Sequence, residues 1–325
     1  MLFFKKVLNK FNGLYFKQEY LCLAKELLEQ PLCVYISAEN RAIKDITNHH
    51  LFIGYSPLVL AFPFYKEIDL SRNEHVDILF SDHQLKPNDI VTTKDALARI
   101  SLRKIHEQGL GTDRYYCYEG ISGRHRFISA AYQLIIALQN QLYNKKPGNV
   151  FLAGNLLKQV QIAYSIPRII SLVTVEQNSL FNLFPTDLHG QISDEYYIIS
   201  LRQGGKAAQQ VEMTKKVLVT EVDPSFYKTV YSLGKNHMQD FKTKEQFPFG
   251  DRFSDLLKLP LPRSAVYFRE LEWQQSFDHG IHRFFLFKIM SKRQILDKPA
   301  TLAHIHTVCA TWRHNKALPG NYLLR

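Results

Sequence analysis

The chain has few cysteines, and none stands at a spacing typical of metal or redox chemistry. Only four of its 325 residues are cysteine, with no Cys-x-x-Cys pair and no zinc-like pattern. In a chain of this size they are most simply reduced, buried, small apolar residues. The pattern argues against a disulfide framework and favours a cytoplasmic protein.

Long hydrophobic runs are missing as well. The longest, residues 127–142, is interrupted by serine, glutamine and asparagine, so it predicts a core helix and not a membrane span. The first eleven residues hold too short an apolar run for the hydrophobic region of a secretory signal peptide. We therefore expect a soluble protein with no membrane partner.

Several catalytic signatures are also absent. The sequence has no Gly-x-Ser-x-Gly nucleophile elbow and no Gly-x-Gly-x-x-Gly after an expected strand. The glycine loop at 120–126 lacks the lysine-hydroxyl ending of a nucleotide-triphosphate loop, so we read it as the start of a helix. The histidine pairs at 49–50 and 304–306 have no third ligand at a supporting spacing, and no metal site is predicted.

The chain is basic, with a net charge of +11 and a pI near 9.3. This excess is spread over both halves, whereas a nucleic-acid binder more often concentrates it on one stripe or tail. Nucleic acid is therefore not an expected partner. A mildly basic surface explains the charge, and a positively biased cleft for an anionic nucleotide fits equally well.

The length suggests two domains, or one large domain with additions. Pro147-Gly148 within residues 144–149 marks the best linker, separating an N-terminal α+β region (1–148) of unknown role from a second unit (149–325). In the first region we expect helices at 15–30, 94–104 and 127–143, and strands at 32–37, 58–64, 76–80 and 115–118.

The second unit is rich in expected strands. They lie at 169–175, 181–184, 196–201, 216–222, 264–273 and 282–289, with short helices at 209–214 and 226–233. Short strands with intervening turns predict a small β-barrel with peripheral helices. The fold class expected for the whole chain is α+β, mainly β.

A faint internal repeat links the two units. Residues 32–62 can be superimposed without gaps on residues 169–199, at an offset of 137, and two strand-turn-strand patterns then coincide. Identity is very low, so chance coincidence is the competing explanation. If the repeat is real, the N-terminal region is a degenerate second barrel packed against the first.

Three motifs follow one another in the second unit: IPRIISLVT at 166–174, FNLFPT at 181–186 and GIHRFFLF at 280–287. With these motifs in this order, residues 155–295 resemble the flavin reductase-like, FMN-binding split-barrel family. Residues 166–174 resemble the family's Pro-Arg-Pro strand, which ends in Val-Thr. Residues 181–186 (FNLFPT) resemble its Asn-x-x-Pro-Ser loop, and the likeness continues through 198–206. Residues 280–287 resemble the late strand with a Gly-Asp-His turn. The order and spacing of the motifs carry the resemblance, which covers less than half of the chain.

The resemblance implies a noncovalently bound FMN, with FAD as the alternative, and NAD(P)H as reductant. His282 would lie near the nicotinamide side of the flavin. The implied flavin ligands are Asn182, Leu183, Phe184, Pro185, Thr186, Arg202 and Lys206. Flavins of the family lie at a homodimer interface, so we expect a homodimer, or an internal pseudo-dimer if the N-terminal region is a second barrel.

The residue chemistry is compatible with this implication. A flavin phosphate needs cations, hydroxyls and free backbone N–H groups, which Thr186, Arg202, Lys206 and the pair Gly204-Gly205 can supply. The alternative is a solvated basic turn.

The sequence departs from the family at several positions. Its first hairpin, residues 176–179, lacks the usual glycine. Asp187 brings a carboxylate close to an anionic cofactor, and Ala207 stands where a hydroxyl often holds the phosphate. The leading hypothesis is a flavin reductase-like oxidoreductase. A non-enzymatic flavin carrier or sensor, and a cofactor-free barrel that binds an anionic partner, remain open.

Overall fold

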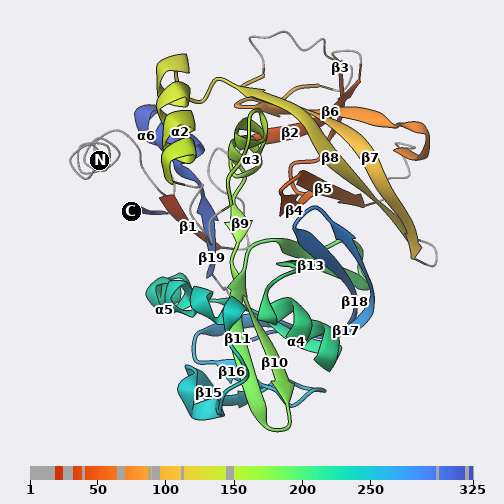
Figure 1. Cartoon of the computed structure of the whole chain (residues 1–325), viewed down its shortest axis with the longest axis vertical. Helices are drawn as coiled ribbons and strands as arrows, with labels where there is room; N and C mark the ends of the chain where they lie inside the picture. The colour runs from red at the N-terminus through yellow and green to blue at the C-terminus, as the bar shows by residue number, and fades with distance from the viewer. Residues whose placement is uncertain are drawn as a thin grey trace.

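The computed structural model describes residues 19–24, 32–38, 41–63, 70–86, 89, 96–110, 113–143, 150–297, 300–318 and 322–324. Two seven-stranded antiparallel sheets dominate these residues, one above the other in Figure 1. The expected fold class, α+β and mainly β, is confirmed. The linker expected at 144–149 lies outside the described residues, and the domain boundary near residue 148 stays a prediction.

The sheet of the second unit forms the curved body in the lower part of Figure 1. Its spatial order is β11-β10-β14-β17-β18-β13-β12, with every neighbouring pair antiparallel. The strands are β10 (Ser171–Gln177), β11 (Leu180–Thr186), β12 (His189–Gln191), β13 (Tyr196–Arg202), β14 (Lys216–Val222), β17 (Ala265–His279) and β18 (His282–Gln294). The six strands expected in this unit are confirmed.

Two short segments cover this sheet and later form walls of the site. Helix α4 (Lys206–Thr214) follows β13 and buries Ala207, Ala208 and Val211 against the sheet. The 3-10 helix η3 (Leu233–Met238) follows η2 (Pro224–Phe226) and α5 (Tyr227–Ser232) and packs beside β11. These positions confirm the helices expected near 209–214 and 226–233.

The first unit contains the other large sheet. Its order is β3-β2-β6-β7-β8-β5-β4, again fully antiparallel. The strands are β2 (Cys33–Ala38), β3 (Arg41–Asp45), β4 (Leu51–Tyr55), β5 (Leu58–Pro63), β6 (His75–Ser81), β7 (Ala98–Leu110) and β8 (Asp113–His125).

The two sheets share one topology. If the strands of each are numbered along the chain, both read 2-1-5-6-7-4-3 across the sheet. Their registers also agree. Leu51 pairs with Ala61 in the first sheet, and the residues 138 positions later, His189 and Ile199, pair with each other in the second. This separation is one residue longer than the offset of 137 taken from the sequence. The repeat of the topology is therefore real, whereas its descent from a flavin-binding barrel stays a prediction.

Equivalent faces of the two sheets pack against each other. Tyr115 and Cys117, the third and fifth residues of β8, share a buried cluster with Phe284 and Leu286, the third and fifth of β18. Each is at most 3% exposed. Burial of several large apolar side chains in this cluster, at about 1.5–3 kcal/mol each, stabilises the contact between the units.

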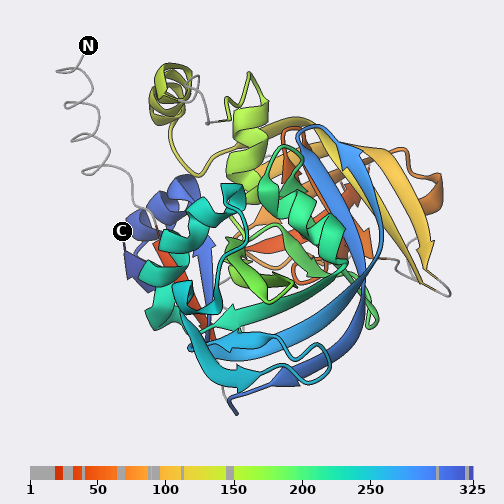
Figure 2. The ribbon, with the colours of Figure 1, turned by 60° about the horizontal axis from the view of Figure 1, so that its bottom comes forward.

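The remaining elements join or cover the two sheets (Figure 2). A four-stranded sheet has the order β20 (Tyr322–Leu324), β1 (Glu19–Ala24), β19 (Ala300–Ile305) and β9 (Arg168–Ile169). The other elements are α2 (Ala130–Tyr143), α3 (Leu156–Ala163), α6 (Thr307–Asn315), β15 (Phe249–Phe253), β16 (Pro260–Pro262), η1 (Leu70–Arg72) and η4 (Lys244–Gln246).

Two expected helices are wrong. Residues 19–24 form β1, because β19 and β20 supply backbone hydrogen-bond partners on both sides. Residues 98–110 form β7, where Ala98, Ile100 and Leu102 are buried in alternation while Arg99 pairs with Asp77. Apolar residues at every second position fit a strand. A short apolar pattern is compatible with a helix or a strand, and pairing with neighbouring strands decided for the strand. The helix expected at 127–143 is confirmed as α2.

Among the helices that the structure describes, none combines the length and apolar character needed to cross a bilayer. Within the same described ranges, no group of three or more metal-binding side chains converges.

Candidate functional site

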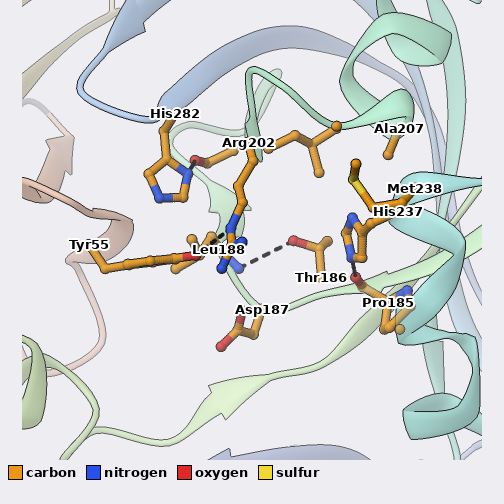
Figure 3. Close-up of a pocket in the computed structure, with 14 residues that line it drawn as sticks. Tyr55, Pro185, Thr186, Asp187, Leu188, Arg202, Ala207, His237, Met238 and His282 are labelled. Atoms are coloured by element: carbon orange, nitrogen blue, oxygen red, sulfur yellow. Dashed lines mark hydrogen bonds between the residues drawn. The ribbon is translucent and has the colours of Figure 1, made fainter. Parts of the chain in front are cut away.

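A cavity of about 360 Å³ opens where the second sheet meets α4, η3 and the first sheet. This volume is within the range of small-molecule binding sites. Its lining residues are Tyr55, Pro185, Thr186, Asp187, Leu188, Ser200, Leu201, Arg202, Gly205, Ala207, Gly234, His237, Met238 and His282, of which Figure 3 labels ten. Four residues singled out in the sequence, Pro185, Thr186, Arg202 and His282, therefore meet in one cavity.

The N-terminus of α4 forms one corner of this cavity. Gly205 is the N-cap residue, and no side chain caps the helix. The first-turn N–H groups of a helix have no partner within it, and they carry the positive end of the helix dipole. Thr186 and Arg202 project into the cavity from neighbouring positions (Figure 3). Free N–H groups, a hydroxyl and a guanidinium make this corner suitable for a phosphate.

Arg202 reaches the cavity from the end of β13. Its Nε donates a hydrogen bond of 2.7 Å to the hydroxyl of Tyr55, which lies at the end of β4 in the first sheet. The guanidinium carbon is 5.7 Å from the centroid of the Tyr55 ring. The site thus includes a residue from the first unit, which no local motif around Tyr55 indicated.

Lys206, the other expected cation, lies elsewhere. It is the first residue of α4, and its Nζ pairs with the carboxylate of Asp240 on the exposed side of the helix. Lys206 is not among the residues that line the cavity. Of the two cations that the sequence singled out, the structure brings only Arg202 to the cavity.

Asn182 is buried behind the cavity wall. Its Nδ2 donates to Gln210 Oε1 at 2.6 Å and to the Asn236 carbonyl at 3.0 Å, and its Oδ1 accepts from the Leu183 N–H at 2.8 Å. These bonds tie β11 to α4 and η3, the two segments that wall the cavity. Leu183 and Phe184 are fully buried in apolar clusters and do not line the cavity either.

His282 lies deep in the cavity wall and is 1% exposed. Its Nδ1 is 3.1 Å from Ser200 Oγ, and its ring meets the Tyr55 ring edge-on at 4.6 Å. Nε2 is buried and has no hydrogen-bond partner among the described residues. Burial, assisted by the charge of Arg202, lowers the pKa of His282 to about 4, so the imidazole is neutral at pH 7. A buried polar atom without a partner is the kind of group that a ligand completes.

His237 is a cavity residue that the sequence reasoning missed. It belongs to η3, and its Nε2 donates to the Pro185 carbonyl at 2.6 Å. Burial lowers its pKa, so the ring is neutral and fixed in one tautomer. With thirteen histidines in the chain, only the fold distinguishes this one.

Asp187 lines the cavity, but its charge is compensated. The carboxylate accepts a hydrogen bond of 2.9 Å from His304 Nε2, and its backbone carbonyl accepts two from the guanidinium of Arg168. Burial alone raises the pKa of Asp187, yet the His304 hydrogen bond and the charges of His304 and Arg168 outweigh it and hold the pKa well below its usual range. A paired carboxylate repels an anionic ligand much less than an isolated one would.

The donor set fits a phosphate-bearing planar ligand such as a flavin. Thr186, Arg202 and the open helix end can bind the phosphate, while the unpartnered Nε2 of His282 can meet a polar ring edge. Ala207 contributes no hydroxyl, so Thr186 supplies the hydroxyl at this corner.

Comparison with known proteins gives structural likeness only. No protein-family model and no curated protein matches the chain. Over about half of its length, the chain is similar to flavin-binding proteins. An NADH:FAD oxidoreductase of Streptomyces globisporus is 13% identical with a TM-score of 0.41, covering 50% of this chain and 95% of that one. The FMN-binding protein of Thermus thermophilus with bound p-hydroxybenzaldehyde is 17% identical with a TM-score of 0.39, covering 44% and 83%. The styrene monooxygenase flavin reductase of Pseudomonas putida S12 is 14% identical with a TM-score of 0.38, covering 51% and 96%.

The buried histidines predict a loss of stability in mild acid. Burial lowers the pKa to about 4 for His50, His189 and His282 and to about 3 for His306. The unfolded chain takes up these protons near pH 6.5 while the folded protein excludes them. The free energy of unfolding should therefore fall as the pH drops from 6.5 towards 4, by up to about 1.4 kcal/mol per pH unit for each histidine.

Urea unfolding at pH 7.5, 6.0 and 5.0 measures this slope. His306→Phe is the matched variant, because a phenyl ring keeps the stacking on Tyr164, whose ring centroid is 3.6 Å away. In this variant, the free energy of unfolding should fall less steeply with decreasing pH, by the contribution of one histidine. A free energy of unfolding that stays constant from pH 7.5 to 5.0 would contradict the prediction.

Proposed function

We propose that the cavity binds FMN noncovalently, with the phosphate at the corner formed by the α4 N-terminus, Thr186 and Arg202. FAD is the larger alternative. The observation that carries the proposal is the uncapped N-terminus of α4, which opens into the same cavity as the Arg202 guanidinium and the unpartnered His282 Nε2. A helix N-terminus combined with a guanidinium is a strong phosphate site.

The activity we propose is that of a flavin reductase-like oxidoreductase, in which NAD(P)H is the reductant and free flavin or another molecule the acceptor. A bound flavin supplies hydride transfer, and the protein supplies binding, orientation and electrostatics. Arg202 and α4 would hold the phosphate, while Tyr55 and Leu188 would keep water from the ring. His282 would be the catalytic residue.

The neutral state of His282 limits what it can do. Burial lowers the pKa of His282 to about 4, so at pH 7 its imidazole would bring no positive charge to the flavin ring. If the Ser200 hydroxyl donates to Nδ1, the proton of the ring is on Nε2. In that tautomer, His282 would donate a hydrogen bond to the ring edge of the flavin.

We infer an internal pseudo-dimer and not a homodimer as the unit that forms the site. The face of the second sheet at Phe284 and Leu286 is covered by the equivalent face of the first sheet. A second copy of the chain is not needed to complete the cavity, since Tyr55 comes from the same chain. The mass of the purified protein in light scattering should be that of one chain of 37.9 kDa.

The absorbance spectrum of the purified protein tests the ligand, and NAD(P)H oxidation tests the activity. We expect flavin absorbance bands, with FMN released on denaturation, or uptake of added FMN by a colourless preparation. Steady oxidation of NADH or NADPH with free flavin present would support the enzyme. Bound FMN without turnover would favour a carrier or sensor. A protein that ignores added FMN would contradict both flavin hypotheses.

A further inference from the structure

The turn after β4 in the first unit docks on the turn between β17 and β18 in the second. The Ser56 carbonyl accepts a hydrogen bond of 3.0 Å from the Ile281 N–H. Gly280, in the same turn, has a φ of +60°, and a Cβ added to it would lie 2.1 Å from Ser56 O and 2.2 Å from Pro57 Cδ. No side chain fits there, so a glycine at position 280 permits the contact between the units.

This junction is directly connected to the cavity. Tyr55 precedes Ser56, and His282 follows Ile281. On the second unit, the Gln203 side-chain amide donates to the carbonyls of Gly280 and His282, both at 3.1 Å. Gln203 is the residue after Arg202. Hydrogen bonds to three backbone carbonyls therefore fix the relative positions of Tyr55, His282 and Arg202.

Tyr55 occupies one donor of Arg202 and leaves the others for a ligand. The Tyr55 hydroxyl accepts from Nε at 2.7 Å, and Tyr55 and Thr186 lie on opposite sides of the Arg202 side chain (Figure 3). Burial raises the pKa of Tyr55, which therefore keeps its own proton. A guanidinium held at Nε loses less rotational freedom when its terminal nitrogens bind a phosphate.

We infer that Tyr55 is a positioning residue for ligand phosphate recognition, supplied to the second unit's site by the repeated sheet of the first unit. This rests on the proposed flavin site for the identity of the ligand. Tyr55 acts through Arg202, so its hydroxyl contributes to the binding of a phosphorylated flavin and not to that of riboflavin, which has the same ring without the phosphate. The docking of the two units thereby sets the preference for FMN over riboflavin.

The test compares FMN and riboflavin binding to the full chain and to Tyr55→Phe, measured by flavin fluorescence. The phenylalanine keeps the ring beside His282 and removes only the hydroxyl. We expect the dissociation constant for FMN to rise about tenfold, in line with the loss of one hydrogen bond to a charged group, and that for riboflavin to change less than twofold. Equal losses for both ligands, or no loss for FMN, would overturn the inference.

A remote variant tests the junction itself. Gly280→Ala must displace the turn at Ser56 and Pro57 that directly follows Tyr55, and we expect the same selective loss of FMN binding. Gly109→Ala is the control, since Gly109 lies in β7 and an added Cβ meets nothing within 4 Å. Circular dichroism and thermal unfolding would verify that each variant folds. Normal FMN binding by a folded Gly280→Ala variant would contradict a role for the junction.

A measurement without ligand separates this inference from the proposed function. In the NMR spectrum of the unliganded protein, the Arg202 Nε–H should be protected from exchange with water and lose that protection in Tyr55→Phe. An unprotected signal in the unchanged protein would overturn the positioning role, even if FMN binds. Failure of the unchanged protein to bind either flavin would instead refute the proposed function, while the Arg202 signal would still decide whether Tyr55 positions Arg202.

Discussion

Arg202→Ala is expected to weaken FMN binding about 10- to 100-fold, because hydrogen bonds to a charged group contribute about 1.5–3 kcal/mol. Arg202 is the cation that shares the cavity with Thr186 and the open end of α4. Its removal leaves the phosphate with the hydroxyl and the helix N–H groups alone. Riboflavin binding should be much less affected, because riboflavin has no phosphate to lose contact with.

Lys206→Ala is the matched control for this variant. Lys206 is four residues away in sequence and carries the same charge, but its Nζ pairs with the largely exposed Asp240. We expect its FMN dissociation constant to stay within about threefold of the unchanged protein, because exposed ion pairs contribute about 0–1 kcal/mol. Fluorescence titration of both variants measures the difference. A larger effect for Lys206 than for Arg202 would show that the phosphate is bound on the outer side of α4.

Asn182→Leu is expected to lower the free energy of unfolding by about 3–5 kcal/mol. The substitution leaves two buried groups without their partner, Gln210 Oε1 and the Leu183 N–H, and leaves the Asn236 carbonyl with the Gln239 N–H alone. Each unsatisfied group costs about 1–3 kcal/mol. FMN affinity should fall with stability, since α4 and η3 lose their common anchor on β11.

Urea unfolding measures this effect, with Gln209→Leu as the control. Gln209 is also on α4, adjacent to Gln210, but its side chain is exposed, so its replacement should change the free energy of unfolding by less than about 0.5 kcal/mol. If Asn182→Leu lost FMN binding while its stability stayed unchanged, Asn182 would be a ligand contact, as the family resemblance implied, and not part of the frame.

The strands of the second unit could be predicted because each has its own apolar pattern bounded by turn residues. Part of the site followed from this, since Arg202 and His282 are paired directly across β13 and β18. Residues at the ends of adjacent antiparallel strands meet whatever the details of the packing. Pro185 and Thr186 lie at the end of β11, at the edge of the sheet away from β13, so their approach to Arg202 depended on the tertiary fold.

Other features depended on contacts between distant segments. The pattern at 94–104 was compatible with a helix or a strand, and pairing with β6 and β8 decided for the strand β7. The polar side chain of Asn182 suggested a ligand contact, but Gln210 and Asn236 satisfy it inside the protein. Local sequence does not reveal which polar group will find an internal partner, because that partner comes from another element.

By itself, the sequence determined a mainly β chain, because strand patterns are local, and its family resemblance pointed to Thr186, Arg202 and His282. The repeat of the sheet topology came from the structure, at an offset one residue longer than the 137 tried on the sequence. Only the tertiary structure decided that Tyr55 completes the cavity and that Lys206 pairs with Asp240. It also decided that His304 and Arg168 compensate the negative charge of the Asp187 carboxylate. These outcomes depend on the docking of two sheets whose contacting residues are more than a hundred positions apart, a distance at which sequence spacing carries no geometry.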